Sequence, residues 1–474
     1  MKLFNSLSDD YCEIKGKIRK IIRIYLCGIT VYDDCHIGHA RTIIIFDVLR
    51  RYLKHMGFQV VFVQNFTDVD DKIINKAKKE GTRAIEISDK YIASYFSDFS
   101  RLNVVRADFY PKATDHIDEM LSIIGVLLSK DFAYPTQNGI YFRVKRFESY
   151  GKLSRKSIEE LESGSRIEID PLKADPLDFA LWKFSQEEPV WNSPWGKGRP
   201  GWHIECSAMA LKYLGSEIEI HGGGQDLIFP HHENEIAQSE SYSNKIFSKL
   251  WMHVGLVTLN TEKMSKSFGN IMKVREALTK YGPNTLRLYL LSTHYSKPLD
   301  YNDKFLSEAS HKWRQIENCI FELRAVKNPG DLSIDKSNVD KVLVEFESAM
   351  DNDLNTSLAL SFVLKLASMV NRISSLGNLT NESSTAILPI MESMLEVLGL
   401  KVVDVPDVER IDIEQLIELR NKLRKQKRFQ ESDEIRKKLY NTYGVELMDH
   451  ANHTNWKKIE NPIVGNRSDL EKKI

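Results

Sequence analysis

The sequence IIRIYLCGITVYDDCHIGHARTIIIFDVLRRYLKHMGFQVVFVQNF, residues 21–66, contains two apolar runs on either side of a helical pattern. The runs Ile21–Cys27 and Phe58–Phe66 are rich in β-branched residues, which favours buried strands. Between them, residues 37–56 carry apolar side chains at helical spacing, and Gly57 follows as a helix stop. A strand, a helix and a second strand in this order predict a parallel α/β sheet.

The rest of the chain changes character twice. Proline, glycine and tryptophan are frequent between about Tyr110 and Pro200, which indicates a region inserted into the sheet. Strand patterns return at residues 216–220 and 250–257, so the sheet resumes after the insertion. After about Asp303 the periodicity is almost wholly helical, which predicts a helical bundle followed by a small C-terminal module.

Composition excludes some classes of protein. The 474 residues include 66 basic and 66 acidic side chains, so only local patches bear on nucleic-acid binding. Five scattered cysteines do not form a disulfide framework and fit a reducing compartment, where thiols serve metals or catalysis. No apolar run of about 18 residues and no signal pattern is present, so we expect a cytoplasmic protein without membrane contact.

Two histidines, His36 and His39, lie where the first strand gives way to the helix, with Gly38 between them. A helix N-terminus presents free N–H groups and partial positive charge, which suits phosphate. Imidazoles three residues apart share one helical face and could donate hydrogen bonds as charge develops on a phosphoryl group. Gly38 lets a nucleotide approach closely. The alternative is that the histidines merely cap the helix.

Lys263 and Lys266 belong to a second motif, KMSKS, which follows an apolar strand and precedes Phe268-Gly-Asn270. This context is typical of a loop. Two lysines three residues apart, with two hydroxyls, can wrap a pyrophosphate group. The alternative is a solvated basic loop.

The pair of motifs, HIGH and KMSKS, resembles the class I aminoacyl-tRNA synthetases. The resemblance implies a Rossmann-type sheet, with the phosphates of ATP and its Mg²⁺ between the two motifs. It also implies that the carboxylate of an amino acid attacks the α-phosphorus and gives an aminoacyl-adenylate and pyrophosphate. Such a reaction depends on orientation and charge stabilisation. We expect Lys266, then Lys263, to hold the phosphates, and His36 and His39 to act mainly in the transition state.

Four further residues have the chemistry of metal ligands: Cys27, Cys206, His231 and Glu235. Cys27 ends the first strand, and His231 and Glu235, four residues apart, lie on one side of a predicted helix. Two thiolates, an imidazole and a carboxylate are a good zinc set. The alternatives are that Cys27 is a small buried hydrophobe and that His231 and His232 begin a helix exposed to solvent.

The sequences Cys27–Asp33, Pro200–Met209 and His221–Ile236 resemble the cysteinyl-tRNA synthetase family. The resemblance implies one zinc ion per chain that binds the substrate thiolate directly, with His232 outside the ligand set. Zinc takes sulfur readily and deprotonates a bound thiol, whereas a serine hydroxyl is a poor ligand. We expect Glu235 to loosen when the substrate sulfur binds. The implied ligands are Cys27, Cys206, His231 and Glu235.

Residues near these ligands are candidates for substrate contacts. Trp202, His203 and Thr30 are expected to line the amino-acid pocket, although core packing explains Trp202 equally well. The glycines at 222–224 predict a tight turn with room for adenosine, and Asp226 would bind ribose hydroxyls or the substrate amine. The expected ATP-binding residues are Gly38, Gly223, Asp226 and Lys266.

Residues 420–438 carry nine lysines and arginines against three acidic residues, with Tyr440, Tyr443 and Trp456 nearby. Basic groups beside aromatic rings suit contacts to a nucleic-acid backbone and base stacking, and a solvated helix face is the alternative. The segment resembles the family's anticodon-binding module. The family usually has Gly-Thr before a tryptophan and one variable residue, whereas this chain has His453-Thr-Asn-Trp456. The expected tRNA contacts are Arg420, Arg424, Lys427, Arg428 and Trp456.

The resemblance implies a monomeric ligase for L-cysteine, ATP and tRNA-Cys. The alternatives are a ligase that passes cysteine to a sugar amine, which lacks a basic C-terminal module, and a non-catalytic RNA-binding paralogue, which loses motif residues. We expect residues 1–109 and 200–256 as halves of the Rossmann-type catalytic domain, 110–199 as the inserted α+β connective domain, 257–305 as the KMSKS stem-contact region, 306–403 as the helical bundle and 404–474 as the anticodon-binding module with a tail.

Overall fold

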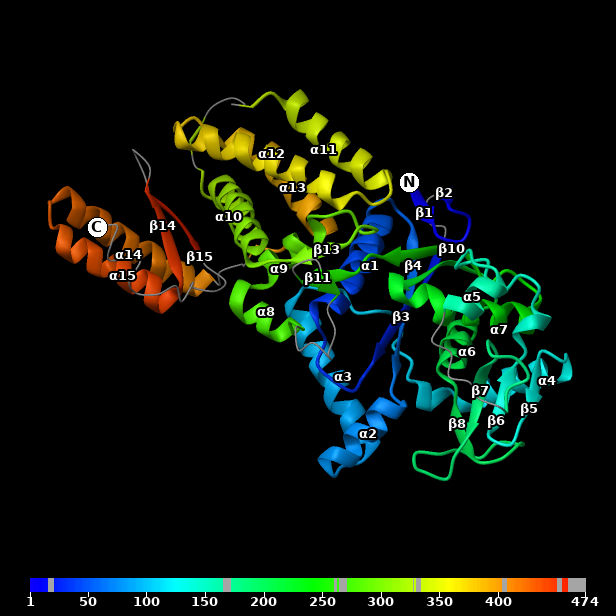
Figure 1. The fold of residues 1–474 in the computed structure, drawn as a ribbon. Helices are drawn as coiled ribbons and strands as arrows, with labels where there is room; N and C mark the ends of the chain where they lie inside the picture. Colours follow the sequence, from blue (N-terminus) through cyan, green and yellow to red (C-terminus); the bar gives the residue numbers. More distant parts are fainter. Residues whose placement is uncertain are drawn as a thin grey trace. The chain divides into compact units, whose positions relative to one another are not determined.

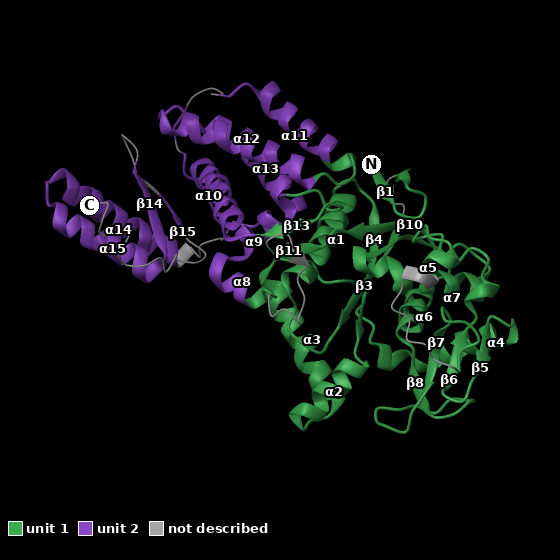
Figure 2. Cartoon of the chain, in the orientation of Figure 1, with its two compact units in different colours: residues 1–275, 293–301, 350–355 green, residues 276–292, 302–349, 356–474 purple. Residues whose placement is uncertain are grey.

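The computed structural model describes residues 1–15, 21–164, 172–259, 262–263, 271–326, 328–329, 334–402, 407–449 and 454–458. The chain divides into two compact units (Figure 2). Unit 1 comprises residues 1–275, 293–301 and 350–355, and unit 2 comprises residues 276–292, 302–349 and 356–474. Within the described ranges, no helix is both long and apolar enough to cross a membrane.

Unit 1 contains a four-stranded parallel sheet, of which Figure 1 labels β3, β4 and β10. The strand order is β10-β9-β3-β4. Helix α1 (Ile37–His55) joins β3 to β4 on one side, and the chain later returns to place β9 on the other side of β3. The strand order therefore reverses beside β3, and ligands of such sheets bind at the carboxyl ends of the strands at that point. The strands are β3 (Ile21–Thr30), β4 (Gln59–Thr67), β9 (Ile218–Gly224) and β10 (Ser248–Val254).

The glycines at 222–224 differ from the prediction. We expected a tight turn, but all three continue β9 to its end. A Cβ atom on Gly222 would lie 2.1 Å from the carbonyl oxygen of Met252 in β10 and 2.5 Å from the Phe46 ring. A side chain at residue 222 has no room, because the backbone of β10 and the side chain of Phe46 in α1 approach closely. The predicted turn is wrong, because these glycines are part of the strand.

The inserted region forms an antiparallel sheet in the order β5-β6-β7-β8. Its core is continuous with that of the parallel sheet, since Phe142 and Trp182 belong to the same buried cluster as Tyr25 and Trp251. The elements of this region, with the helices that follow, are α4 (Ile117–Ser129), β5 (Ala133–Pro135), β6 (Gly139–Phe142), α5 (Ile158–Gly164), β7 (Phe179–Phe184), β8 (Gly198–Pro200), α6 (Trp202–Leu214) and α7 (Glu233–Ser243).

Within the described residues, unit 1 also contains two smaller sheets. An N-terminal hairpin, which the sequence did not reveal, pairs β1 with β2, and a three-stranded sheet has the order β12-β11-β13. The remaining elements are β1 (Lys2–Asn5), β2 (Asp10–Glu13), α2 (Asp71–Glu80), α3 (Ala84–Arg101), β11 (Val257–Leu259), β12 (Glu262–Lys263) and β13 (Leu299–Tyr301).

Unit 2 is mainly helical, as predicted, but it also contains an unexpected hairpin, β14–β15. The hairpin and the helix pair α14–α15 share a small core of Ile413, Ile417, Leu439, Val445 and Leu447. The elements are α8 (Val274–Tyr281), which begins in unit 1, α9 (Pro283–Leu291), α10 (Asp303–Ala325), α11 (Lys336–Asp351), α12 (Thr356–Ser375), α13 (Asn381–Leu398), α14 (Asp407–Lys425), α15 (Phe429–Tyr443), β14 (Val445–Asp449) and β15 (Thr454–Lys458). The predicted fold class is confirmed.

Candidate active site

The four predicted metal ligands meet in one buried group, which we call the donor cluster: Cys27, Cys206, His231 and Glu235. Cys27 comes from β3, Cys206 from α6 and Glu235 from α7, while His231 lies in the π-helical turn of residues 228–232 just before α7. Their donor atoms all lie within 4.8 Å of one another. None of the four residues is more than 7% exposed, so the expected alternative of a solvent-exposed His231 is wrong.

The spacing of the donor cluster suits a tetrahedral metal. The two sulfur atoms, Cys27 Sγ and Cys206 Sγ, are 3.8 Å apart. Zinc–sulfur bonds of about 2.3 Å at tetrahedral angles separate two sulfurs by about 3.8 Å. Glu235 Oε1 lies 3.2 Å from Cys27 Sγ and 3.0 Å from His231 Nε2. Donor chemistry, burial and spacing therefore all fit a zinc ion.

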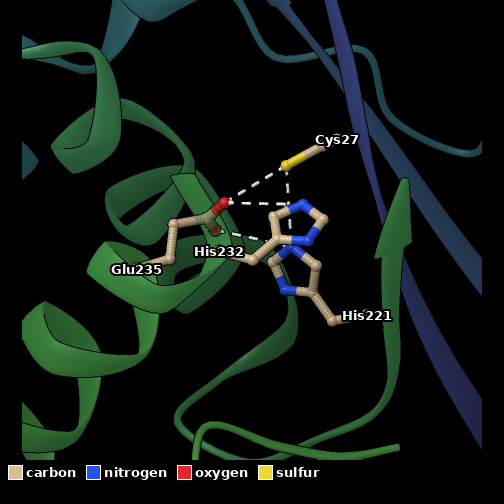
Figure 3. A group of neighbouring side chains, drawn as sticks. All are labelled: Cys27, His221, His232 and Glu235. Atoms are coloured by element: carbon tan, nitrogen blue, oxygen red, sulfur yellow. Dashed lines mark hydrogen bonds and ion pairs between the residues drawn. The ribbon is translucent and has the colours of Figure 1, made fainter. Parts of the chain in front are cut away.

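Two further histidines adjoin the donor cluster. His221 and His232 form with Cys27 and Glu235 a second group of potential ligands (Figure 3). His221 Nε2 lies 3.6 Å from Cys27 Sγ and 3.4 Å from Glu235 Oε2. His232 Nε2 is 4.0 Å from Glu235 Oε1 and has no hydrogen-bond partner among the residues that the structure describes.

A chain of hydrogen bonds leads away from His232. Its Nδ1 lies 2.8 Å from Nε2 of His253 in β10, and His253 Nδ1 lies 2.8 Å from Ser6 Oγ. Sequence reasoning did not select His221 or His253. The available signal was a histidine within each of the apolar strands β9 and β10.

Burial makes the donor cluster unfavourable for its own negative charges. Desolvation raises the pKa of the Cys27 thiol and of the Glu235 carboxyl well above their usual values. A hydrogen bond from Cys27 lowers the pKa of Cys206 to about 7, so one thiolate forms at the expense of the other. A divalent cation among these donors would favour their ionised forms, and its charge would outweigh the desolvation.

Trp202 and His203, at the start of α6, both touch His231. The Trp202 indole is stacked on the His231 ring, with ring centroids 4.2 Å apart and an angle of 24° between the planes. Nδ1 of His203 lies 2.9 Å from Nδ1 of His231. Trp202 is 39% exposed, so core packing, the alternative for this residue, is wrong. Thr30 ends β3 and pairs with Thr67 at the carboxyl edge of the sheet.

His36 and His39 do cap α1, which was the alternative reading of this motif. Nδ1 of His36 accepts the Gly38 N–H at 3.1 Å, and Nδ1 of His39 accepts the His36 N–H at 3.4 Å. The two rings are stacked with centroids 3.7 Å apart. A Cβ atom on residue 38 would lie 2.9 Å from the His36 ring, so a larger residue there would push this ring out of its capping position. The cap uses the Nδ1 atoms of the two histidines, so capping does not exclude the predicted role in binding phosphate.

The KMSKS motif lies mostly outside the described residues. The backbone of Lys263 ends β12, whereas its side chain and residues 264–270, including Lys266, are not described. Directly afterwards the chain binds to the HIGH motif, since the Ile37 N–H donates to the Met272 carbonyl at 3.1 Å and the Val274 N–H donates to that of Cys35 at 2.8 Å. The segment that follows the KMSKS motif in the sequence is therefore held by backbone hydrogen bonds at the start of α1, beside the HIGH motif.

Gly223 and Asp226 lie near the carboxyl end of β9. A Cβ atom on Gly223 would lie 2.8 Å from the Leu227 side chain and 3.2 Å from the His232 ring. Asp226 is exposed in the 3₁₀ turn of residues 225–227, which directly follows the strand.

The predicted tRNA contacts are spread over the module of α14, α15 and the β14–β15 hairpin. Arg420, expected to contact tRNA, is only 1% exposed and donates two hydrogen bonds of 2.8 Å to Asp449. Arg424 donates to the same carboxylate at 2.9 Å, and Arg428 donates to Glu431 at 2.6 Å. Arg420 therefore stabilises the module, and its assignment as a surface contact is corrected.

Two members of that set remain. Lys427 is exposed between α14 and α15, with a positive φ of 57°. Trp456 in β15 is partly buried and packs against the small core of the module, so its ring is less available for stacking than we expected.

Comparison with known proteins gives two family matches. A family model described as the catalytic domain of class I (C) tRNA synthetases matches residues 14–311, and one described as the DALR domain matches residues 345–402. A solved structure of Mycobacterium tuberculosis methionyl-tRNA synthetase with methionyl-adenylate has a TM-score of 0.59 at 14% identity, covering 80% of this chain and 89% of that one. At this identity the likeness concerns the fold alone.

Curated relatives are far closer in sequence. The chain is 46% identical to the cysteine–tRNA ligase of Thermodesulfovibrio yellowstonii, covering 96% of this chain and 99% of the relative. It is 44% identical to the cysteine–tRNA ligase of Carboxydothermus hydrogenoformans, with 97% and 100% covered. It is also 44% identical to that of Geobacter sulfurreducens, with 96% and 99% covered.

Proposed function

The chain belongs to the cysteine–tRNA ligase family of class I aminoacyl-tRNA synthetases, and from this premise we propose that a zinc ion in its donor cluster selects L-cysteine by binding the thiolate. The reaction joins L-cysteine and ATP into cysteinyl-adenylate and pyrophosphate, then transfers the cysteinyl group to the 3′ end of tRNA-Cys with release of AMP. The observation that carries the zinc proposal is the donor cluster itself, in which two sulfurs 3.8 Å apart are buried beside an imidazole and a carboxylate.

A metal bond explains selection better than packing does. Cysteine and serine differ by one atom, and shape complementarity over one methylene discriminates by only about 1–3 kcal/mol. Zinc acts as a Lewis acid that favours the deprotonated thiol over a hydroxyl. Cys27, Cys206 and His231 would hold the ion throughout, and Glu235 would be the ligand that loosens to admit the substrate sulfur.

The residues around the donor cluster would orient the two small substrates. Trp202, His203 and Thr30 would line the cysteine pocket at the carboxyl edge of the sheet. For ATP with its Mg²⁺, Lys263 and Lys266 would hold the phosphates, and Gly38, Gly223 and Asp226 would contact the nucleoside. His36 and His39, at the N-terminus of α1, would stabilise the charge that develops during adenylation.

The tRNA would contact unit 2. The DALR match supports this proposal, although it ends at residue 402 and so covers the helical bundle rather than the module at 404–474. Within that module Arg424, Lys427, Arg428 and Trp456 remain the proposed contacts. The six segments defined from the sequence, a monomeric state and a cytoplasmic location also stand as proposals.

The decisive experiment is ATP–pyrophosphate exchange with each amino acid, followed by charging of total tRNA. We expect exchange with cysteine alone, charging of tRNA-Cys and about one zinc per chain. Equal exchange with serine would contradict the zinc proposal. Cysteine-dependent exchange without any charging would favour the ligase that passes cysteine to a sugar amine.

A further inference from the structure

The imidazole of His231 has its two nitrogens in different surroundings. Nε2 faces the donor cluster, 3.0 Å from Glu235 Oε1, whereas Nδ1 lies 2.9 Å from Nδ1 of His203. We propose that His203 is a positioning residue that accepts the Nδ1–H of His231 and so keeps the Nε2 lone pair of His231 directed at the metal. This inference rests on the zinc site of the proposed function and changes the role of His203 from lining the pocket to orienting a ligand.

The proton count supports this direction of the hydrogen bond. Two ring nitrogens 2.9 Å apart share one proton, so one of them donates and the other accepts. A neutral histidine can bind a metal through Nε2 only when its proton is on Nδ1. His231 must then donate, and His203 must accept through an unprotonated Nδ1.

The opposite tautomer would close the site. With its proton on Nε2, His231 would donate to Glu235 Oε1, 3.0 Å away, and both groups would be lost to a metal. An acceptor at the position of His203 Nδ1 therefore favours the tautomer that binds metal over the one that satisfies Glu235 internally. Partners of this kind commonly change metal affinity by about 10–100-fold.

The fold holds His203 in place for this role. His203 lies three residues before the ligand Cys206, on the same face of α6. The helix start is tightly seated, because a Cβ atom on Gly201 would lie 1.9 Å from the Ala180 carbonyl oxygen of β7. The Phe179 and His203 rings pack edge to face, with centroids 5.5 Å apart and planes at 82°.

Trp202, the first residue of α6, also contacts the His231 ring. Its indole covers one face of the His231 ring, so His231 is held by a stacked neighbour as well as by a hydrogen bond. Helix α6 thus supplies one metal ligand and two residues that orient another. The hydrogen bond sets the tautomer, whereas the stacking contact sets only the plane of the ring.

Two substitutions at residue 203 separate a hydrogen-bond role from a packing role. In His203→Asn the side-chain oxygen can still accept near the position of Nδ1, whereas His203→Phe keeps an aromatic ring but has no acceptor. The measurement is the rate at which the zinc-loaded full-length chain releases zinc to a chromophoric chelator. His311→Phe, at an exposed position on α10, is the matched control.

We expect His203→Phe to release zinc about 10–100-fold faster than the wild type, and His203→Asn and His311→Phe to stay within about threefold of it. Zinc release by His203→Phe at the same rate as the wild type would overturn the inference. So would equally fast release by His203→Phe and His203→Asn, because the acceptor would then be irrelevant.

Melting temperatures with and without zinc separate positioning from general destabilisation. His203→Phe should match the wild type without metal and gain less on zinc addition, since bound metal stabilises in proportion to its affinity. A lower metal-free melting temperature with unchanged zinc release would reduce His203 to a structural residue. Failure of the proposed function looks different: the wild type would hold no zinc, or His231→Ala would keep it.

Discussion

The donor cluster and the basic helix pair α14–α15 were both selected from the sequence by residue type, and the structure treats them differently. In the donor cluster, residues up to 208 positions apart bring four donor atoms together. In the helix pair, three of the predicted contacts, Arg420, Arg424 and Arg428, bind acidic groups of their own module. A thiol or imidazole beside a buried carboxylate has few possible functions other than binding a metal. An arginine on a helix can equally bind a nucleic acid, pair with an acidic side chain or face solvent.

Energetics explain the contrast. Burying ionisable groups is costly unless they are paired or bind a metal, so a buried set of thiols, imidazole and carboxylate indicates a ligand. Surface charges cost little to place and contribute little when paired, so a basic run does not by itself identify a partner.

The largest effect is expected for Cys206→Ser. A hydroxyl is a poor zinc ligand, so zinc content should fall well below one per chain and kcat/KM for cysteine in pyrophosphate exchange should fall by about 10³-fold or more. Metal analysis and exchange assays measure the two effects. Cys319→Ser, at a buried cysteine of α10, is a matched control that should keep both zinc and activity. If Cys206→Ser keeps both, the donor cluster is not the metal site.

A smaller loss is expected for His39→Asn. The amide oxygen can replace Nδ1 as acceptor of the His36 N–H, so the cap is kept while the outer ring nitrogen is lost. We expect kcat of exchange to fall about 10²-fold, with KM for ATP within about threefold, because the lost interaction strengthens in the transition state. A raised KM at unchanged kcat would mean that the histidine only anchors the nucleotide.

Arg420→Ala should lower the stability of the C-terminal module and should not remove a direct contact with tRNA. Removing a buried guanidinium leaves Asp449, itself 31% exposed, without its main partner. The cost should be about 2 kcal/mol, below the roughly 3–5 kcal/mol of a wholly buried pair. Arg424→Ala, which removes an exposed partner of the same carboxylate, should cost less than about 1 kcal/mol. Hydrogen exchange of the β14–β15 hairpin measures both values.

The same pair predicts a pH dependence. Hydrogen bonds from Arg420 hold the pKa of Asp449 well below its usual value. Because the folded pKa is depressed, the stabilisation is complete above the unfolded pKa of about 3.9 and is lost as the pH falls below it. The difference between the wild type and Arg420→Ala should therefore persist at neutral pH and shrink progressively as the pH falls below about 4. A difference that grows on acidification would contradict this assignment.

The smallest effect is expected for Lys427→Ala. Loss of one phosphate contact should weaken tRNA binding a few-fold and lower the salt slope of log Kd by about one. Lys54→Ala, at an exposed position of α1 in unit 1, should leave both unchanged. An unchanged salt slope in Lys427→Ala would mean that the turn between α14 and α15 does not contact tRNA. The basic residues of this helix pair would then predict function still less well than the residues of the donor cluster.

The sequence predicted those parts of the molecule whose signals are local and long. The helix α1 and the strands β3 and β4 have long apolar patterns, and the position of Cys27 near a strand end follows from them. The hairpins β1–β2 and β14–β15 were missed because each strand has only four or five residues. Short strands carry too little periodicity to be recognised.

The remaining errors concern contacts between distant residues. The burial of Arg420 depends on Asp449 in the hairpin that the sequence did not reveal. His221 lies near the ligands because β9 pairs with β3, where His221 is opposite Tyr25. The sequence of a single strand does not show which strand it pairs with, so this position could not be predicted. Donor chemistry was therefore predictable, whereas the residues that orient the donors, including His203, required the structure.

Zinc in the donor cluster is proposed to bind the sulfur atom of the substrate directly. X-ray absorption at the zinc edge counts sulfur neighbours at about 2.3 Å directly. We predict two sulfurs in the purified enzyme, three after addition of L-cysteine, and two after addition of L-serine. A zinc site that keeps two sulfurs at saturating L-cysteine would contradict the claim, even if the metal itself were present.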